Sequence, residues 1–273
     1  MRSRRDGGAL TGRVNFGQQS SETRLAERHG STLEPCFPTD RRYHRSLGFA
    51  YEAFVRGVAG EGAATVLRGL DGPALHSFDR DARCEAVRLA AAFGLQTSLS
   101  LNFLPRSLDA LGDAVSNTLD VALECGLSPQ QLILEVTEGE IIHDPGRFAR
   151  QINSFKSSGM RPAIDDFGSG YAGLNLLAEF QPDIVKIDMT LVRDIDSKGP
   201  RQAIARALIQ VCRDLGLEII AEGVETESEV RWFKRCGVDV FQGYYFARPA
   251  FQRLEDLTSA RPSTDPSASR SAR

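Results

Sequence analysis

The stretch LILEVTEGEIIHDPGRFARQINSFKSSGMRPAIDDFGSGYAGLNLLAEFQPDIVKID, residues 132–188, decides the fold. It contains short apolar runs at 132–138, 161–167 and 183–188, each with carboxylates near its end, and helix-length segments lie between them. Apolar runs of this length that alternate with helical patterns are typical of a parallel sheet with crossover helices. The segment therefore predicts an α/β fold.

The same alternation extends outward in both directions. Further strands are predicted at 48–56, 97–103, 217–223 and 238–246, and helices at 80–93 and 202–215 with Gly94 and Gly216 as their stops. A poorly marked strand near 35–42 brings the strands to eight within about 220 residues, which is the strand count and size of a (β/α)8 TIM-like barrel. A doubly wound open sheet is the alternative architecture.

The composition excludes several classes of protein. The 273 residues are 41% hydrophobic and 25% charged, as in an average globular chain and unlike a disordered or collagen-like one. The net charge of −3 gives no global positive field, so direct nucleic-acid binding is not expected. No apolar run reaches the roughly 18 residues of a membrane helix, and the start, MRSRRDGGAL, lacks the apolar region of a secretory signal. Five scattered cysteines without a CxxC pair fit a reducing compartment, so we expect a cytoplasmic protein without membrane contact.

Both ends of the chain differ in composition from the middle. Residues 1–35 are rich in Arg, Ser, Gly and Gln with little apolar periodicity, which predicts a disordered or weakly structured arm. Residues 255–273 have the same character, so the barrel domain is assigned to 36–254. The basic arm is interpreted as solvated rather than as a contact for nucleic acid or an acidic partner.

Polar side chains stand at the ends of successive predicted strands. The carboxyl ends of parallel barrel strands meet at one mouth, where barrel enzymes carry their chemistry. The side-chain period of two places Glu135, Asp165 and Lys186 each on one face of its strand, whereas Asp166 points the other way or already lies in the turn. The strand-end residues that could converge at the mouth are Glu52, Asn102, Glu135, Asp165, Asp166, Lys186 and Glu222.

This set of side chains favours a metal site. Several carboxylates at one mouth repel each other unless cations hold them together. The donors are all oxygen atoms, which select Mg²⁺ or Mn²⁺, and no histidine stands at a strand end, so a His-based zinc site is not expected. The adjacent Asp165 and Asp166 could bridge two ions about 4 Å apart. Separate surface acids and salt bridges are the alternative interpretation.

A glycine motif follows these aspartates. Residues 168–173, GSGYAG, match GxGxxG between a predicted strand and a helix, the pattern of a dinucleotide-binding loop. Asp165 and Asp166 immediately before it would repel a pyrophosphate, and the motif lies deep in the chain. A glycine-hinged loop that responds to metal or substrate is the preferred interpretation.

The chain resembles the EAL-domain cyclic di-GMP phosphodiesterases. The motifs that carry the resemblance follow the family in order over roughly residues 46–252: YEAFVR, LNFLP, LEVTEGE, AIDDFGSGYAGLNLL, PDIVKIDM, IIAEGVET and FQGYYFARP. The resemblance implies a barrel, Mg²⁺ or Mn²⁺ (two ions), and hydrolysis of cyclic di-GMP to linear pGpG.

The resemblance also implies roles for individual residues. The first metal would be held by Glu52, Asn102, Glu135 and Asp165, and the second by Asp165, Asp166 and Glu222. Lys186, Glu222 and Asp166 would be the catalytic residues, with Lys186 and Glu222 positioning or deprotonating the attacking water. The substrate would be bound by Arg56 and Gln242. Glu138 would anchor the loop that contains Gly168 and Gly170, which in this family couples activity to dimerisation, so a homodimer is expected.

Two departures from the family pattern affect these expectations. Phe54 replaces the usual Leu of the EAL triplet and is expected to crowd the base-binding groove. The first strand is expected to be degenerate, because its nearest equivalent, CFPTDRRYHR (36–45), lacks the usual Gln and apolar pair. A weak first strand and the lack of a GGDEF or sensor domain leave a second function open, a non-catalytic module that binds cyclic di-GMP or a protein. The complete set of metal ligands favours the enzyme.

Overall fold

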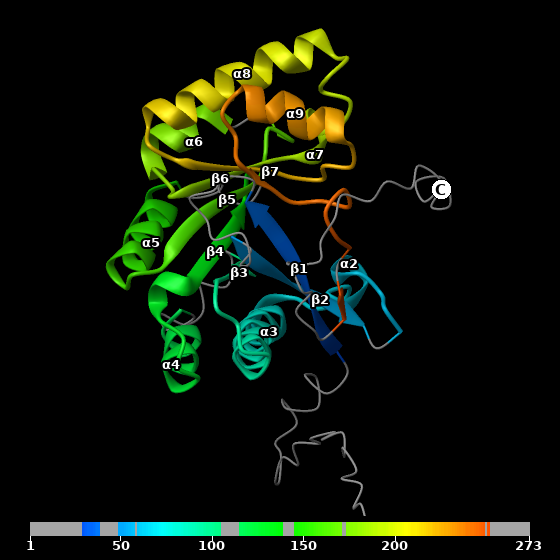
Figure 1. The fold of residues 1–273 in the computed structure, drawn as a ribbon. Coiled ribbons are helices and arrows are strands. Elements are labelled where there is room, and N and C mark those ends of the chain that lie inside the picture. The colour runs from blue at the N-terminus through cyan, green and yellow to red at the C-terminus, as the bar shows by residue number, and fades with distance from the viewer. Residues whose placement is uncertain are drawn as a thin grey trace, which may run out of the picture.

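The computed structural model describes residues 29–38, 49–57, 59–104, 115–138, 145–170, 173–248 and 250–251. The described part forms a curled sheet with helices around its outer face (Figure 1). The strands are β1 (His29–Pro38), β2 (Ala50–Gly57), β3 (Ser98–Asn102), β4 (Leu132–Thr137), β5 (Arg161–Phe167), β6 (Ile184–Ile187), β7 (Glu218–Ala221), β8 (Val240–Phe241) and β9 (Ala250–Phe251).

The strands from β2 to β8 pair in parallel and in sequence order. Each crossover therefore leads to the next strand along, as in a barrel, and the chain never returns to the other side of β2 as in a doubly wound sheet. The predicted TIM-like fold is confirmed. The register places Asn102 beside Glu135 and Thr137 beside Asp165, so the polar strand ends are neighbours.

The first strand differs from the prediction. β1 runs antiparallel to β2, from the pair His29 and Gly57 to the pair Cys36 and Ala50, and its last two residues pair with β8. It thereby joins the two ends of the parallel sheet. The strand predicted near 35–42 begins earlier than expected, at His29, so residues 29–35, assigned to the arm, belong to β1. It also runs antiparallel, whereas a parallel sheet was expected. The rest of the predicted degenerate strand (39–45), residues 1–28 of the arm and the tail at 255–273 lie outside the described residues.

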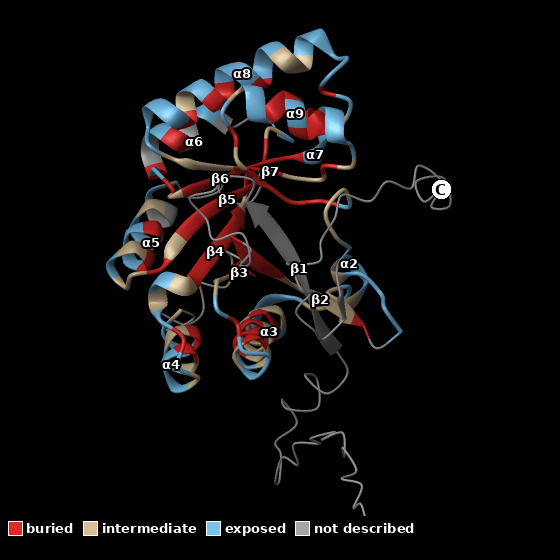
Figure 2. Cartoon of the chain, in the orientation of Figure 1, coloured by how far each residue is buried: buried red, intermediate tan, exposed pale blue. Residues whose placement is uncertain are grey.

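The helices cover the outer face of the sheet, with their buried sides toward the sheet and their exposed sides outward (Figure 2). They are α2 (Ala63–Val66), α3 (Gly72–Ala92), α4 (Ser116–Glu124), the 3₁₀ helix η2 (Pro129–Gln131), α5 (Pro145–Ser157), α6 (Gly173–Phe180), α7 (Met189–Val192), α8 (Gly199–Asp214) and α9 (Glu227–Arg235). The predicted helices 80–93 and 202–215 lie largely within α3 and α8, and Gly94 and Gly216 follow them with φ of +73° and +72°. Helix α3 begins earlier than predicted, at Gly72, because Pro73 suits a first helical turn.

Two layers of buried residues hold the barrel together. The larger lies between the sheet and the helices, and includes Leu99, Leu134, Val185 and Phe233. The smaller contains Phe49 and one residue each from six strands: Ala50, Ile133, Ala163, Ile184, Ile220 and Val240. Among the described residues, no helix is long and apolar enough to cross a membrane.

Candidate metal and catalytic site

The polar site rests directly on the smaller apolar layer. Side chains two positions apart on a strand share a face. The residue two positions after each member of the apolar layer therefore lies next to it, toward the carboxyl end of the strand. Ala50, Ile133, Ala163, Ile184, Ile220 and Val240 are followed two positions later by Glu52, Glu135, Asp165, Lys186, Glu222 and Gln242. The apolar layer fixes the strands, and the next layer toward the carboxyl ends is polar. The structure brings together the residues that the sequence placed at the barrel mouth, and Gln242 joins them.

Lys186 lies at the centre of this polar layer. Its side chain is 1% exposed, and its Nζ atom lies 2.8–3.0 Å from carboxylate oxygens of the following residues: Glu52, Glu135, Asp165 and Glu222. Burial lowers the pKa of the ammonium group, but these carboxylates outweigh burial and raise the pKa well above its ordinary value. Lys186 is therefore positively charged.

Neutral side chains orient two of the carboxylates. Glu52 accepts hydrogen bonds from Asn102 Nδ2 (3.1 Å) and Gln242 Nε2 (2.8 Å). Ser100 Oγ donates to Glu135 Oε1. The amide of Asn102 faces Glu52 with its nitrogen, which leaves the amide oxygen as the donor atom for a cation. Ser100 lies two positions before Asn102 on the same face of β3, and sequence analysis gave it no role.

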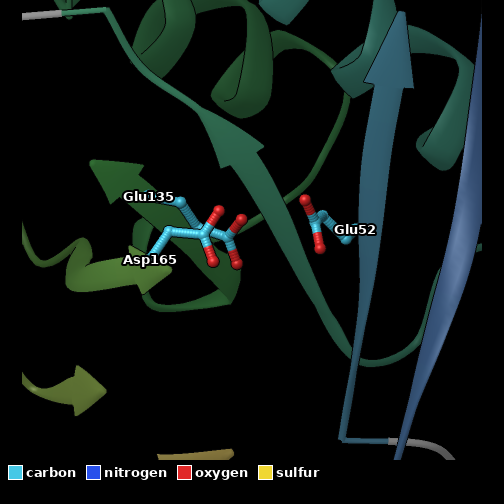
Figure 3. A group of neighbouring side chains, drawn as sticks. All are labelled: Glu52, Glu135 and Asp165. Atoms are coloured by element: carbon cyan, nitrogen blue, oxygen red, sulfur yellow. The ribbon is translucent and has the colours of Figure 1, made fainter. Parts of the chain in front are cut away.

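The carboxylates form two groups that could hold metal ions. In each group, one oxygen per residue lies within 4.8 Å of the others: Glu52 with Glu135 and Asp165, and Asp165 with Asp166 and Glu222. Figure 3 shows Glu135 and Asp165 close together, with Glu52 facing them from β2. Asp165 belongs to both groups, as the predicted bridging ligand would. Five carboxylates and one ammonium leave four negative charges, the charge that two divalent cations would neutralise.

The raised pKa values of three acids in the cluster indicate that bound cations would stabilise it. Burial, followed by repulsion from Glu52, raises the pKa of Glu135 well above its ordinary value. Burial also raises the pKa of Glu222, against the attraction of Lys186. Partial loss of hydration and the charge of Asp165 raise the pKa of Asp166 to about 6. Lys186 alone does not compensate the acids, so the donor set fits hard divalent ions.

A break in the sheet register brings both aspartates to the mouth. The pairing of β5 with β6 shifts between Ile164 and Phe167, and Asp166 has a φ of +53°. The extra residue turns the Asp166 side chain toward the carboxylate oxygens of Asp165 and Glu222 instead of the opposite face. Left-handed backbone is rare for residues other than glycine, and here it lies at the site.

The cluster opens into a cavity of about 560 Å³. Its acidic end includes Glu52, Asp165, Asp166, Lys186 and Glu222, and its apolar end includes Phe54, Leu67, Phe78, Ala86 and Leu101. Phe54 thus lines the cavity, and its crowding of a bound base stays a prediction. The buried pair Asp79 and Arg83 also lines the apolar end, and sequence analysis missed both because they lie within a helix.

The predicted loop anchor makes its contacts. A carboxylate oxygen of Glu138, a buried residue, accepts hydrogen bonds from the backbone N–H of Gly168 (3.0 Å) and of Gly170 (3.3 Å). Gly168 has a φ of +94°, and a Cβ atom there would lie 2.5 Å from Leu191 Cδ1. Glycine is favoured at this position, because its left-handed backbone strains other residues and a side chain would also displace the end of Leu191.

Arg56, which was predicted to bind substrate, lies apart from the cluster. Its Nη1 donates to the carbonyl of Val55, its guanidinium lies 5.4 Å from the centroid of the Phe54 ring, and it does not line the cavity described above. Gln242, by contrast, lies inside the polar layer, where it donates to Glu52.

Comparison with known proteins identifies the family. The EAL domain model matches residues 45–249, and the chain belongs to the EAL domain family. The blue light- and temperature-regulated antirepressor BluF of Escherichia coli is 38% identical over 183 residues, which are 66% of this chain and 45% of BluF. Two further relatives from Escherichia coli are named cyclic di-GMP phosphodiesterase PdeR and probable cyclic di-GMP phosphodiesterase PdeD.

Solved structures agree with this assignment. A standalone EAL protein of Vibrio cholerae in its cyclic di-GMP-bound form is 38% identical, with a TM-score of 0.77, over 84% of this chain and 94% of that one. The Klebsiella pneumoniae protein BlrP1, in a complex with manganese and cyclic di-GMP, is 36% identical, with a TM-score of 0.77, over 82% of this chain and 57% of that one. The chain therefore spans less than two thirds of BluF and of BlrP1.

Proposed function

We propose that the chain is a metal-dependent phosphodiesterase that hydrolyses cyclic di-GMP to linear pGpG. The observation that carries the proposal is the pair of carboxylate groups that share Asp165 around Lys186, at one end of a cavity. Similar structures in the family contain manganese or calcium together with cyclic di-GMP. Mg²⁺ or Mn²⁺, two ions, a cytoplasmic location and a homodimer belong to the same proposal.

The residues of the chain would divide the chemistry as follows. Two divalent ions, when bound, would neutralise charge on the phosphodiester and lower the pKa of the attacking water. Glu222 lies at the mouth with a raised pKa, so its carboxylate is suited to accept the proton of that water. Lys186 remains an ammonium group that donates a hydrogen bond to Glu52, and it would help to orient the water.

The remaining residues would bind substrate and order the site. pGpG keeps a 5′-phosphate, so the P–O3′ bond is the one that breaks. The apolar end of the cavity, with Phe54 and Phe78, offers a surface for a purine base. Arg56 would contact a phosphate after moving from Val55 and Phe54, and Glu138 would hold the loop of Gly168 beside the mouth.

Incubation of the purified chain with cyclic di-GMP and Mn²⁺ or Mg²⁺ tests the proposal. We expect pGpG by chromatography from the wild type and a loss of at least about 100-fold in rate for Glu52→Gln and Lys186→Met, which remove a ligand and the central cation. No pGpG from a folded wild type that contains Mn²⁺ would contradict the proposal.

A second function has one observation in its favour. BluF, similar over two thirds of this chain, is named an antirepressor, and this name favours the alternative of a non-catalytic module that binds cyclic di-GMP or a protein. Wild-type protein that binds cyclic di-GMP in calorimetry and returns it intact after prolonged incubation with Mn²⁺ would support this function instead.

A further inference from the structure

Glu229 is a buried carboxylate outside the cluster around Lys186. It lies in the first turn of α9 with 1% of its surface exposed, and it does not line the cavity. Its Oε2 atom accepts the N–H groups of Glu225 and Thr226, both at 2.9 Å. Its Oε1 atom accepts the N–H group of Asp194 at 3.0 Å. One side chain therefore holds two separate loops.

These two loops follow the strands of the catalytic pair. The loop with Asp194 follows β6, which carries Lys186, and the loop with Glu225 begins at Glu222, after β7. The N–H of Glu222 donates to the carbonyl of Ile187 at 3.1 Å, which links the two loops next to the site. Arg193 and Glu225 form an ion pair across the same gap, with Nη2 2.8 Å from Oε1.

Helix capping alone does not account for the hydrogen bonds of the Glu229 carboxylate. A capping box requires a hydrogen bond from the N-cap N–H to the side chain at the third helical position, which the contact with Thr226 supplies. The contact with Asp194 crosses 35 positions of the sequence to another loop. Asp194 has a φ of +56°, a conformation that costs free energy and that the surrounding structure must hold.

We propose that Glu229 is a positioning residue that sets Glu222 against Lys186, at the 2.8 Å separation seen here. It does so by holding the loops of both residues with its two oxygen atoms. The inference rests on the proposed function, because Glu222 is the residue whose placement it controls.

Glu229→Gln tests this role with little change in shape. The amide has one acceptor oxygen instead of two, so one loop loses its hydrogen bond and faces an N–H group. The matched control is Glu227→Gln in the same helical turn, an exposed residue whose carboxylate pairs with Arg231. Both variants remove one charge near the start of α9, and Glu229→Gln also removes a hydrogen bond between the loops.

We expect Glu229→Gln to lower kcat about 10- to 100-fold, because small misplacements of reacting groups have effects of this size. KM should change less than about threefold, since the substrate cavity does not include Glu229. Glu227→Gln should leave kcat within about twofold of the wild type. Rates are measured below the melting temperature of each variant, with folding checked by circular dichroism.

A double-mutant cycle separates positioning from general stability. In a Glu222→Gln background, Glu229→Gln should lower kcat by less than about threefold, because the residue that it positions has already lost its function. Losses that multiply in the double variant, or a folded Glu229→Gln protein with wild-type kcat, would overturn the inference.

A second measurement does not depend on hydrolysis. Glu222 belongs to one of the carboxylate groups, so Glu229→Gln and Glu222→Gln should each reduce the rise in Tm caused by Mn²⁺, whereas Glu227→Gln should not. If the wild type makes no pGpG, the proposed function fails and this Tm comparison still decides the positioning role. An equal rise in wild type and Glu229→Gln, or no rise in any protein, would overturn it.

Discussion

Lys186 is one positive charge among carboxylates that repel each other. Its removal therefore tests how much this charge stabilises the fold. Without metal, Lys186→Met should lower the free energy of unfolding by about 3–5 kcal/mol, the usual cost of losing one partner of a buried ion pair. Mn²⁺ should raise the Tm of this variant more than that of the wild type, because metal then replaces the only cation of the described cluster. Urea denaturation with EDTA or Mn²⁺ measures both effects.

Lys156→Met is the matched control for this prediction. Lys156 pairs with Asp183 at 3.0 Å, but both side chains are about one third exposed. Its loss should cost no more than about 1 kcal/mol, with the same Mn²⁺ response as the wild type. Equal destabilisation by the two substitutions would contradict a central role for Lys186.

Asp166 makes the metal-free protein sensitive to pH. Its pKa is raised from 3.8 to about 6 by partial loss of hydration and by Asp165, so the folded state binds its proton more tightly than the unfolded state does. The stability that this group contributes is therefore complete below pH 4 and lost as the pH rises through about 6.

Asp166→Asn should remove this pH dependence. In EDTA, the variant should be more stable than the wild type at pH 7.5, and the difference should shrink at pH 5. Asn also tolerates the φ of +53° at this position. Asp214→Asn, at the exposed end of α8, serves as the control. Urea midpoints at the two pH values give the comparison, and a constant difference between wild type and Asp166→Asn would count against a raised pKa.

Most site residues could be predicted from the sequence, because strand-end position and the period of two are local properties. Glu52, Glu135 and Lys186 follow this rule directly. The orientation of Asp166 could not be predicted, since it depends on a register shift between β5 and β6. Glu229 was also missed, because a glutamate in a first helical turn looks like an ordinary cap until its contact with Asp194 is known.

At the scale of elements, Arg83 links α3 to α4 and to the end of β3. Its guanidinium forms an ion pair with Asp79, donates to Thr118 of α4 at 3.4 Å, and lies 4.8 Å from the ring centroid of Phe103 after β3. Arg83 is 3% exposed and Asp79 is 8% exposed. Replacing one member of such a pair removes the compensating charge from the other inside the protein.

Arg83→Met should lower the free energy of unfolding by about 3–5 kcal/mol. The double variant with Asp79→Asn should recover part of that loss, because the buried charge is gone as well. Arg88→Met is the control on the same helix, where the side chain is 51% exposed and lies 3.9 Å from Glu85, and it should cost under about 1 kcal/mol. A double variant less stable than Arg83→Met would contradict this account.

The strands differ in how accurately their positions could be predicted from the sequence. β4, β5 and β6 agree with their apolar runs within one residue, because buried parallel strands need continuous apolar segments. β1 was misplaced because its sequence, HGSTLEPCFP, contains two prolines and few apolar residues. Its position is determined by pairing with β2 and β8, which are distant in sequence.

At the scale of the whole molecule, β1 decides whether the described sheet is closed. Without it, β2 and β8 would present unpaired backbone groups, which destabilise a sheet and promote pairing with other chains. The eight Cα pairs between β1 and β2 involve several hydrogen bonds, each worth about 0.5–1.5 kcal/mol. Their sum is comparable with the roughly 5–15 kcal/mol that stabilises a domain.

Removal of residues 1–38 should therefore leave a chain that unfolds at a much lower temperature and forms oligomers through the open edges. Removal of residues 1–28, which keeps β1 (His29–Pro38), should preserve the Tm and the oligomeric state of the full chain. Calorimetry and size-exclusion chromatography of the three proteins give the comparison. If the shorter truncation and the longer one melt at the same temperature as the full chain, β1 does not close the barrel. The site would then be held by the parallel strands and by the apolar layer of Ile133 and Ile184 beneath it.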